Sequence, residues 1–161
     1  MATYTEAAQA ALATGLSELK LIDTLQLYNQ SAGSLYLVNG PEAVTAMLED
    51  STNVTFQPIN FTVEQATSDV PEMTVNTELS NALADWLHAS QASRIASSLR
   101  YRYYLSTDLT APATVDPIEM DMGNVAMTDL VAQIKAQFLN LKKRKGPTLR
   151  YTNALAPSLT D

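Results

Sequence analysis

The residues best suited to chemistry in this sequence are acidic side chains that stand close together. Glu119 and Asp121 alternate with apolar residues over 118–122, so a strand would direct both carboxylates to one face. Such a pair could bind a hard cation, or supply the acid and the base of a glycan hydrolase. Glu49 and Asp50 form a second pair that could bind a cation. We interpret both pairs as solvated surface, because the sequence indicates no pocket around them.

Other catalytic groups are scarce. The chain has no cysteine and a single histidine, His88, which excludes disulfides, thiolate zinc sites, cysteine-bound iron–sulfur clusters and catalysis by paired imidazoles. The sequence contains no phosphate-binding glycine loop, no HExxH, no GxSxG and no EF-hand spacing. We interpret His88, near the end of a predicted helix, as a structural or surface residue. These observations argue against an enzyme, and we expect no catalytic residue, no cofactor and no metal.

Half of the basic side chains stand in one short stretch. They are Lys142, Lys143, Arg144, Lys145 and Arg150, five of the ten. Such a cluster can contact phosphate. The whole chain is nevertheless acidic, with 17 acidic residues and a formal charge of −7, which argues against broad attraction to nucleic acid or to an anionic membrane. We interpret the cluster as a solvated loop or as half of an electrostatic interface with an acidic neighbour.

Length and composition indicate one folded domain. A chain of 161 residues can bury a sizeable core, and 46% hydrophobic with 17% charged residues argues against disorder. No stretch approaches the roughly 18 to 20 apolar residues that span a bilayer. The first 15 residues lack the basic region of a signal peptide. We expect a soluble protein of the cytoplasm, or of an assembly that forms there, with no membrane partner.

Most segments alternate apolar and polar residues with a period of two, which predicts strands. Leucines at even spacing before the turn-like cluster at 30–33 predict a hairpin. Pro58 stands where the apolar parity switches, which predicts a bulge or an edge position. Gly123-Asn124 is expected to turn the chain. Strands are predicted at residues 19–27, 35–38, 54–63, 73–75, 99–105 and 118–122.

Two segments have helical character. Tyr4–Ala13 is rich in alanine, and Thr77–His88 has its apolar residues on one side. Asp129–Leu141 fits a capped helix but also alternates as a strand would, so periodicity leaves both open. The predicted class is β-rich α+β: a split β-barrel or two packed antiparallel sheets, with one flanking helix and extended termini.

Several motifs, taken in order, resemble one known family. An opening hairpin combines Leu19–Tyr28 (LKLIDTLQLY) with Gly33–Gly40 (GSLYLVNG), and Val54–Ile59 (VTFQPI) carries a central proline. Pro71–Asn76 (PEMTVN) precedes a helix, and Pro147–Leu159 (PTLRYTNALAPSL) ends the pattern. In order and spacing, the chain resembles the minor tail proteins of long, non-contractile-tailed phages, which include the lambda-type minor tail proteins M and L.

This resemblance implies a structural virion component at the tail tip, assembled in the host cytoplasm. It implies a homo-oligomeric ring, a hexamer in preference to a trimer, with the tail tube protein and the tail hub proteins as partners. DNA would pass through the ring without specific binding. The resemblance also implies a strand within Asp129–Leu141. The L-type proteins are larger and have cysteines associated with an iron–sulfur cluster, a feature that this chain, without cysteine, does not share.

The resemblance divides the chain into an N-terminal helical arm (1–16), a tail-tip split-barrel domain (17–147) and an extended C-terminal tail (148–161). Glu119 and Asp121 are candidates for lining the channel, because like charge would keep DNA from sticking. We expect both terminal segments to contact neighbouring subunits, since irregular termini are ordered chiefly by partners. The candidate interface residues are Tyr4, Leu12, Lys142, Lys143, Arg144, Lys145, Arg150, Tyr151, Pro157 and Leu159.

Two other functional classes stay open on the sequence alone. A tail-assembly chaperone, or another interaction protein, would equally lack catalytic motifs but would be absent from the finished particle. A tail-associated hydrolase would use a carboxylate pair such as Glu119 and Asp121.

Overall fold

The computed structural model describes residues 5, 6, 9, 13, 20–66, 72–114 and 118–137. Its elements in chain order are β1 (Leu21–Asn29), β2 (Gly33–Asn39), β3 (Val44–Met47), β4 (Asn53–Ile59), β5 (Phe61–Ala66), β6 (Glu72–Glu78), α2 (Asn81–Ser93), β7 (Ser97–Leu105), β8 (Ile118–Met127) and β9 (Val131–Gln137).

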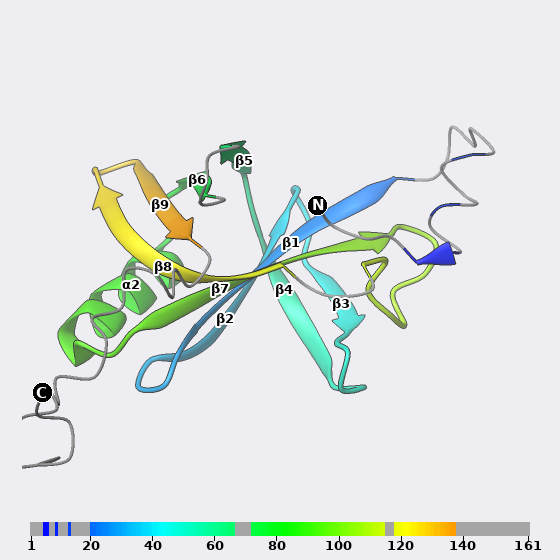
Figure 1. Ribbon diagram of the computed structural model, residues 1–161, viewed down its shortest axis with the longest axis horizontal. Coiled ribbons are helices and arrows are strands. Elements are labelled where there is room, and N and C mark those ends of the chain that lie inside the picture. Colours follow the sequence, from blue (N-terminus) through cyan, green and yellow to red (C-terminus); the bar gives the residue numbers. More distant parts are fainter. Residues whose placement is uncertain are drawn as a thin grey trace, which may run out of the picture.

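The nine strands of the described residues belong to one sheet that is not closed. Its order is β3-β4-β2-β1-β7-β8-β9-β6-β5, and every neighbouring pair is antiparallel except β2 and β4, which run parallel. Figure 1 shows the strong twist of the sheet, with α2 at one end and β3 and β4 at the other. The predicted β-rich α+β class and the hairpin β1–β2 are confirmed, and the strands form one sheet in place of two packed sheets.

One stretch of chain, β4 followed by β5, joins the two ends of this sheet. β4 pairs with β2 through Gln57–Ile59, and β5 pairs with β6 from Phe61 onward. Between them, the carbonyl of Asn60 accepts a hydrogen bond from the N–H of Glu78 (3.0 Å). The N–H of Phe61 donates to the side chain of Asn39 (3.4 Å). The sheet therefore curls on itself, as in the predicted split barrel, with Asn60 at the split.

Pro58 lies where β4 changes its partner. Residues up to Phe56 pair with β3, whereas Gln57, Pro58 and Ile59 pair with β2. Pro58 therefore has a registered neighbour on one side only, which is where a strand tolerates a proline and agrees with the predicted edge position. The apolar residues of this segment also change faces at Pro58 for a second reason. Phe56 belongs to the core on one face of the sheet, and Ile59 belongs to the core on the other.

The inner face of the curled sheet packs against α2. Its core combines apolar side chains of the strands with Leu83, Trp86 and Leu87 of the helix. The hydroxyl of Ser80 accepts a hydrogen bond from the N–H of Leu83 (3.2 Å), which caps the helix. Trp86 Nε1 donates to the carbonyl of Gly33 (3.0 Å). The predicted helix packed on a sheet is confirmed.

α2 differs from the prediction at both ends. Thr77 and Glu78 belong to β6, because Thr77 is buried in register with Phe61 and extends the strand. The helix begins at Asn81 and continues to Ser93. His88 therefore lies within the helix and not near its end, and it is exposed.

β8 runs straight through Gly123-Asn124, so the predicted turn there is wrong. Its register with β9 shifts between Met122 and Val125, as in a β-bulge, and pairing continues on both sides. β9 pairs with β8 on both sides of Gly123-Asn124, so the bulge accommodates these two residues without ending the strand. The chain reverses only after β8, and Val131–Gln137 forms β9. The strand that the family resemblance implies, in place of a helix, is confirmed over these residues.

The outer face of the sheet, opposite α2, carries a second core beneath β3. The sequence did not predict β3, which has only four residues. The rings of Tyr36 and Tyr104 both meet Phe56 edge-on, with centroids 5.5 and 5.8 Å apart. β1 is thus covered on both faces, which buries its polar residues Thr24 and Gln26.

Candidate interaction surface

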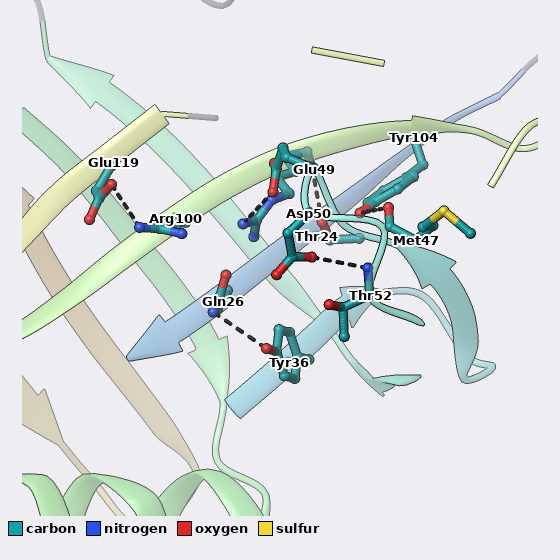
Figure 2. A network of polar contacts seen from close by, with 11 residues as sticks. Thr24, Gln26, Tyr36, Met47, Glu49, Asp50, Thr52, Arg100, Tyr104 and Glu119 are labelled. Atoms are coloured by element: carbon teal, nitrogen blue, oxygen red, sulfur yellow. Dashed lines mark hydrogen bonds and ion pairs between the residues drawn. The ribbon is translucent and has the colours of Figure 1, made fainter. Parts of the chain in front are cut away.

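The outer face beyond β3 carries rows of polar side chains that cross the strands. One row joins Tyr36 on β2, Gln26 on β1, Arg100 on β7 and Glu119 on β8, which are partners in the strand register. Gln26 Nε2 donates to the hydroxyl of Tyr36 (3.5 Å), and Arg100 pairs with Glu119 (3.1 Å; Figure 2). Glu119 is thus half exposed and already balanced by a cation.

Asp121 lies on the next row of β8 and is exposed. Its partner on β9 is Gln137, whose own partner on β6 is Glu72, and Gln137 Nε2 donates to the carboxylate of Glu72. We call Glu72, Glu119 and Asp121 the acidic face. Lys135 of β9 stands beside it, two residues from Gln137. The structure therefore places the two predicted channel-lining residues on one open, acidic part of the sheet.

These carboxylates do not form a metal centre in the part of the chain that the structure describes. No group of three or more His, Cys, Asp or Glu residues there could hold a metal ion. The arrangement presents charge to solvent along the open face of the sheet, which suits contact with a large molecule better than chemistry on a small one.

Arg102 of β7 was not among the site residues predicted from the sequence. Arg102 alternates with the apolar residues of β7, and the second core covers its side chain and leaves only 1% exposed. Arg102 Nε and Nη2 donate to the two carboxylate oxygens of Glu49, at 2.5 and 3.1 Å. Burial disfavours the charged form of Glu49, but the hydrogen bonds and the charge of Arg102 outweigh this and lower the pKa of that carboxyl. The pair holds the turn after β3 against the sheet.

Two further hydrogen bonds fix the same turn, as Figure 2 shows. The hydroxyl of Tyr104 donates to the carbonyl of Met47 (3.0 Å), and burial raises the pKa of Tyr104 to about 12. The carboxylate of Asp50 accepts from the N–H of Thr52 (3.0 Å). Glu49 and Asp50, considered above as cation ligands, therefore both have partners within the protein.

A polar pair lies on the inner face near the split. Asp23 of β1 has hydrogen bonds with Tyr101 and Asn39, yet burial raises its pKa by more than these bonds lower it. Burial likewise raises the pKa of Tyr101, whose ring meets that of Tyr103 edge-on, with centroids 4.7 Å apart. This end of the inner core is therefore polar.

A shallow groove lies where β5, β6 and the turn between β8 and β9 meet. Leu130 and Val131, at that turn, are 77% and 44% exposed. The carbonyl of Leu130 accepts from the N–H of Leu79 (3.0 Å), so the turn is fixed to the chain before α2. The sequence signal for this site was a pair of apolar residues directly after Asp129, which periodicity assigned to a helix or strand. The groove is lined in part by Asn39, Asn60, Phe61, Asn76, Glu78 and Val131.

The described part of the N-terminal arm contacts the loop after β7. The N–H of Thr5 donates to the carbonyl of Ala113 (2.8 Å). Glu6, Gln9 and Ala13 are helical, in agreement with the predicted helix. No helix among the described residues has the length and apolar character of a membrane span. The predicted interface residues lie outside the described residues; they are Tyr4, Leu12, Lys142, Lys143, Arg144, Lys145, Arg150, Tyr151, Pro157 and Leu159.

Known structures include one with the same fold. A chain in the structure titled "Virion of native gene transfer agent (GTA) particle" superposes with a TM-score of 0.60 at 14% sequence identity. The match covers 91% of this chain and 49% of that chain, so the present sequence spans about half the length of its structural relative. No curated protein matches the sequence.

A family model covers most of the sequence. It is described as "Domain of unknown function (DUF1833)" and matches residues 7–151. That range includes the whole sheet and α2. The chain therefore belongs to the DUF1833 family.

Proposed function

We propose that this chain is a structural protein of a phage-type virion, which forms a ring at the tail tip between the tail tube and the distal hub. The observation that carries the proposal is the fold shared with a gene transfer agent virion chain over 91% of the present chain. The ordered motifs that resemble phage minor tail proteins support the tail-tip location. This function needs no catalytic group.

The proposed ring contains six copies in preference to three, because a ring stacked on a hexameric tube would repeat the symmetry of the tube. The tail tube and hub proteins are its proposed neighbours. A closed ring of one chain needs two different, complementary surfaces on each copy. The exposed turn with Leu130 and Val131 supplies one such surface among the described residues.

The acidic face suits the wall of a DNA conduit. Glu119 and Asp121 lie on neighbouring rows of β8, and the chain carries a net charge of −7. Repulsion between like charges lets DNA slide without sticking, and at physiological ionic strength it acts over about 8 Å. We therefore assign the acidic face to the lumen of the proposed ring.

Quantitative mass spectrometry of purified virions and of tail-assembly intermediates tests the proposal. A structural protein should be retained in the virion in fixed proportion to the hub proteins. A tail-assembly chaperone should be enriched in the intermediates and absent from the virion. That second outcome would replace the structural role by the chaperone role.

A further inference from the structure

The groove beside β5 combines exposed apolar surface with acidic side chains. Val131 lines it and is 44% exposed beside the buried Phe61, and Leu130 stands next to Val131 with most of its surface in solvent. Glu78 also lines the groove, and the exposed Asp129 directly precedes Leu130. A binding partner for this groove should therefore carry apolar and basic side chains together.

The backbone next to the groove is also open to a partner. β5 is one end of the sheet order and, within the described residues, pairs with β6 alone. An edge strand presents unpaired N–H and C=O groups, and an extended segment of another chain can pair with them. Phe61 and Thr62 belong both to β5 and to the groove. A segment in extended conformation therefore fits the edge and the groove together.

Residues 142–159 (KKRKGPTLRYTNALAPSL) have the matching composition. They include five of the ten basic residues and none of the 17 acidic ones. Leu149, Tyr151, Leu155 and Leu159 follow the basic run. The segment thus offers positive charge to Glu78 and Asp129 and apolar side chains to Leu130 and Val131.

β9 separates the groove from Gln137, the last described residue before this segment. Val131 lines the groove, and Gln137, at the other end of the strand, is the last described residue. A strand of this length spans about 20 Å. The groove and the last described residue before this segment therefore lie at opposite ends of β9, and a closed ring with head-to-tail contacts requires two different surfaces on each copy.

We infer that residues 142–159 of one copy bind in the groove and along β5 of the next copy. The inference rests on the proposed ring and names the contact that closes it. Basic residues of the segment pair with Glu78 and Asp129, and its apolar residues cover Leu130. Salt should weaken this contact more than it weakens folding, because exposed charges are screened by ions.

Cysteine cross-linking tests the contact directly, because the chain has no cysteine of its own. Two full-length variants, Leu130→Cys and Leu149→Cys, are made separately with tags of different mass, mixed and oxidised. We expect the mixed disulfide dimer to form in at least about tenfold greater yield than in a mixture of Asp85→Cys with Leu149→Cys. Asp85 is the matched control, because it is exposed on α2 away from the groove.

A charge-reversed tail gives the second arm of the test. Changing Lys142, Lys143, Arg144 and Lys145 to Glu in the Leu149→Cys variant should reduce the yield to that of the Asp85 control. Equal yields for the Leu130 and Asp85 mixtures would overturn the inference. The inference would also be overturned if the double variant Leu130→Cys/Leu149→Cys formed its disulfide only within one chain and the mixture of single variants gave no dimer. A chain retained in virions without the cross-link would leave the proposed function standing and remove only this contact.

Discussion

Arg102, with 1% of its side chain exposed, is held by both carboxylate oxygens of Glu49. The two residues lie 53 positions apart, so this ion pair ties the turn after β3 to the middle of β7. If Glu49 is removed, the guanidinium of Arg102 stays buried, and the free-energy cost of its desolvation is no longer offset by a partner. The pair therefore specifies where the turn lies on the outer face.

We expect Glu49→Gln to lower the free energy of unfolding by about 2 to 4 kcal/mol, because it leaves Arg102 charged and buried. The double variant Glu49→Gln/Arg102→Met should lose less, since methionine carries no charge into the core. Glu119→Gln is the control, and breaking its exposed pair with Arg100 should cost less than about 1 kcal/mol. Urea unfolding measures all three variants, and equal losses for Glu49→Gln and Glu119→Gln would contradict this account of Arg102.

The carboxyl of Glu49 also makes the free energy of unfolding depend on pH. The pKa of Glu49 in the folded state lies below its ordinary value of 4.5, so the unfolded chain binds more protons between the two values. The stability that Glu49 contributes is complete above pH 4.5 and is lost as pH falls through the folded-state pKa. We expect Glu49→Gln to lose less stability than the wild type over that fall, measured by urea unfolding at stepped pH. Parallel losses in the two proteins would count against the assignment.

Asp23 should act with the opposite sign. Burial raises the pKa of Asp23 above its ordinary 3.8, so the folded chain binds more protons between the two values and stability falls as pH rises through them. Asp23→Asn should therefore gain stability relative to the wild type as the pH rises from below 3.8 to neutral. The exposed Asp85→Asn serves as the control in the same unfolding series. If the difference in free energy of unfolding between Asp23→Asn and the wild type stays constant across this pH range, Asp23 does not cause the predicted pH dependence.

The single tryptophan joins α2 to the start of β2. Trp86 is 7% exposed, and its indole N–H donates to the carbonyl of Gly33. We expect Trp86→Phe to destabilise the fold by about 1 to 3 kcal/mol, because it removes the hydrogen bond and part of the packed ring. His88→Ala, on the exposed side of the same helix, should change stability by less than about 0.5 kcal/mol. Thermal unfolding followed by circular dichroism compares the two, and similar values would contradict the packing described.

Local periodicity was enough to predict most strands and the helix on the sheet. It failed where pairing with another strand determined the outcome. The bulge at Gly123-Asn124 forms because β9 pairs on both sides of it, and Thr77 joins β6 because Phe61 lies opposite. In both cases the deciding partner lies on another strand, so the residues of one strand alone do not contain the signal.

The candidate surface was predicted only in part. Glu119 and Asp121 do share one face, as alternation along a strand requires. The burial of Arg102 was not predicted, because the core that covers it comes from β3 and the turn after it, about 50 residues away. The groove joins Asn39, Phe61 and Val131 from three parts of the chain, which only the curled sheet brings together.

Reversing charge on the acidic face should slow DNA passage without harming the fold. We expect virions that carry Glu119→Lys/Asp121→Lys to assemble but to eject DNA more slowly, because lysines in the lumen would attract phosphate. The effect should diminish as salt is raised. Asp85→Lys/Glu42→Lys makes the same change of charge at exposed positions elsewhere. Ejection that is equally fast in both variants would show that the acidic face does not line the conduit.

The central claim is that this chain forms a ring at the tail tip, and a cryo-electron microscopy reconstruction of the intact tail tests it most directly. We expect one closed ring of six copies between the tube and the hub, each fitted by the sheet β3-β4-β2-β1-β7-β8-β9-β6-β5 with α2 beside it. The acidic face should line the lumen. A complete tail tip in which every ring is fitted by other proteins, with no density for this chain, would contradict the account.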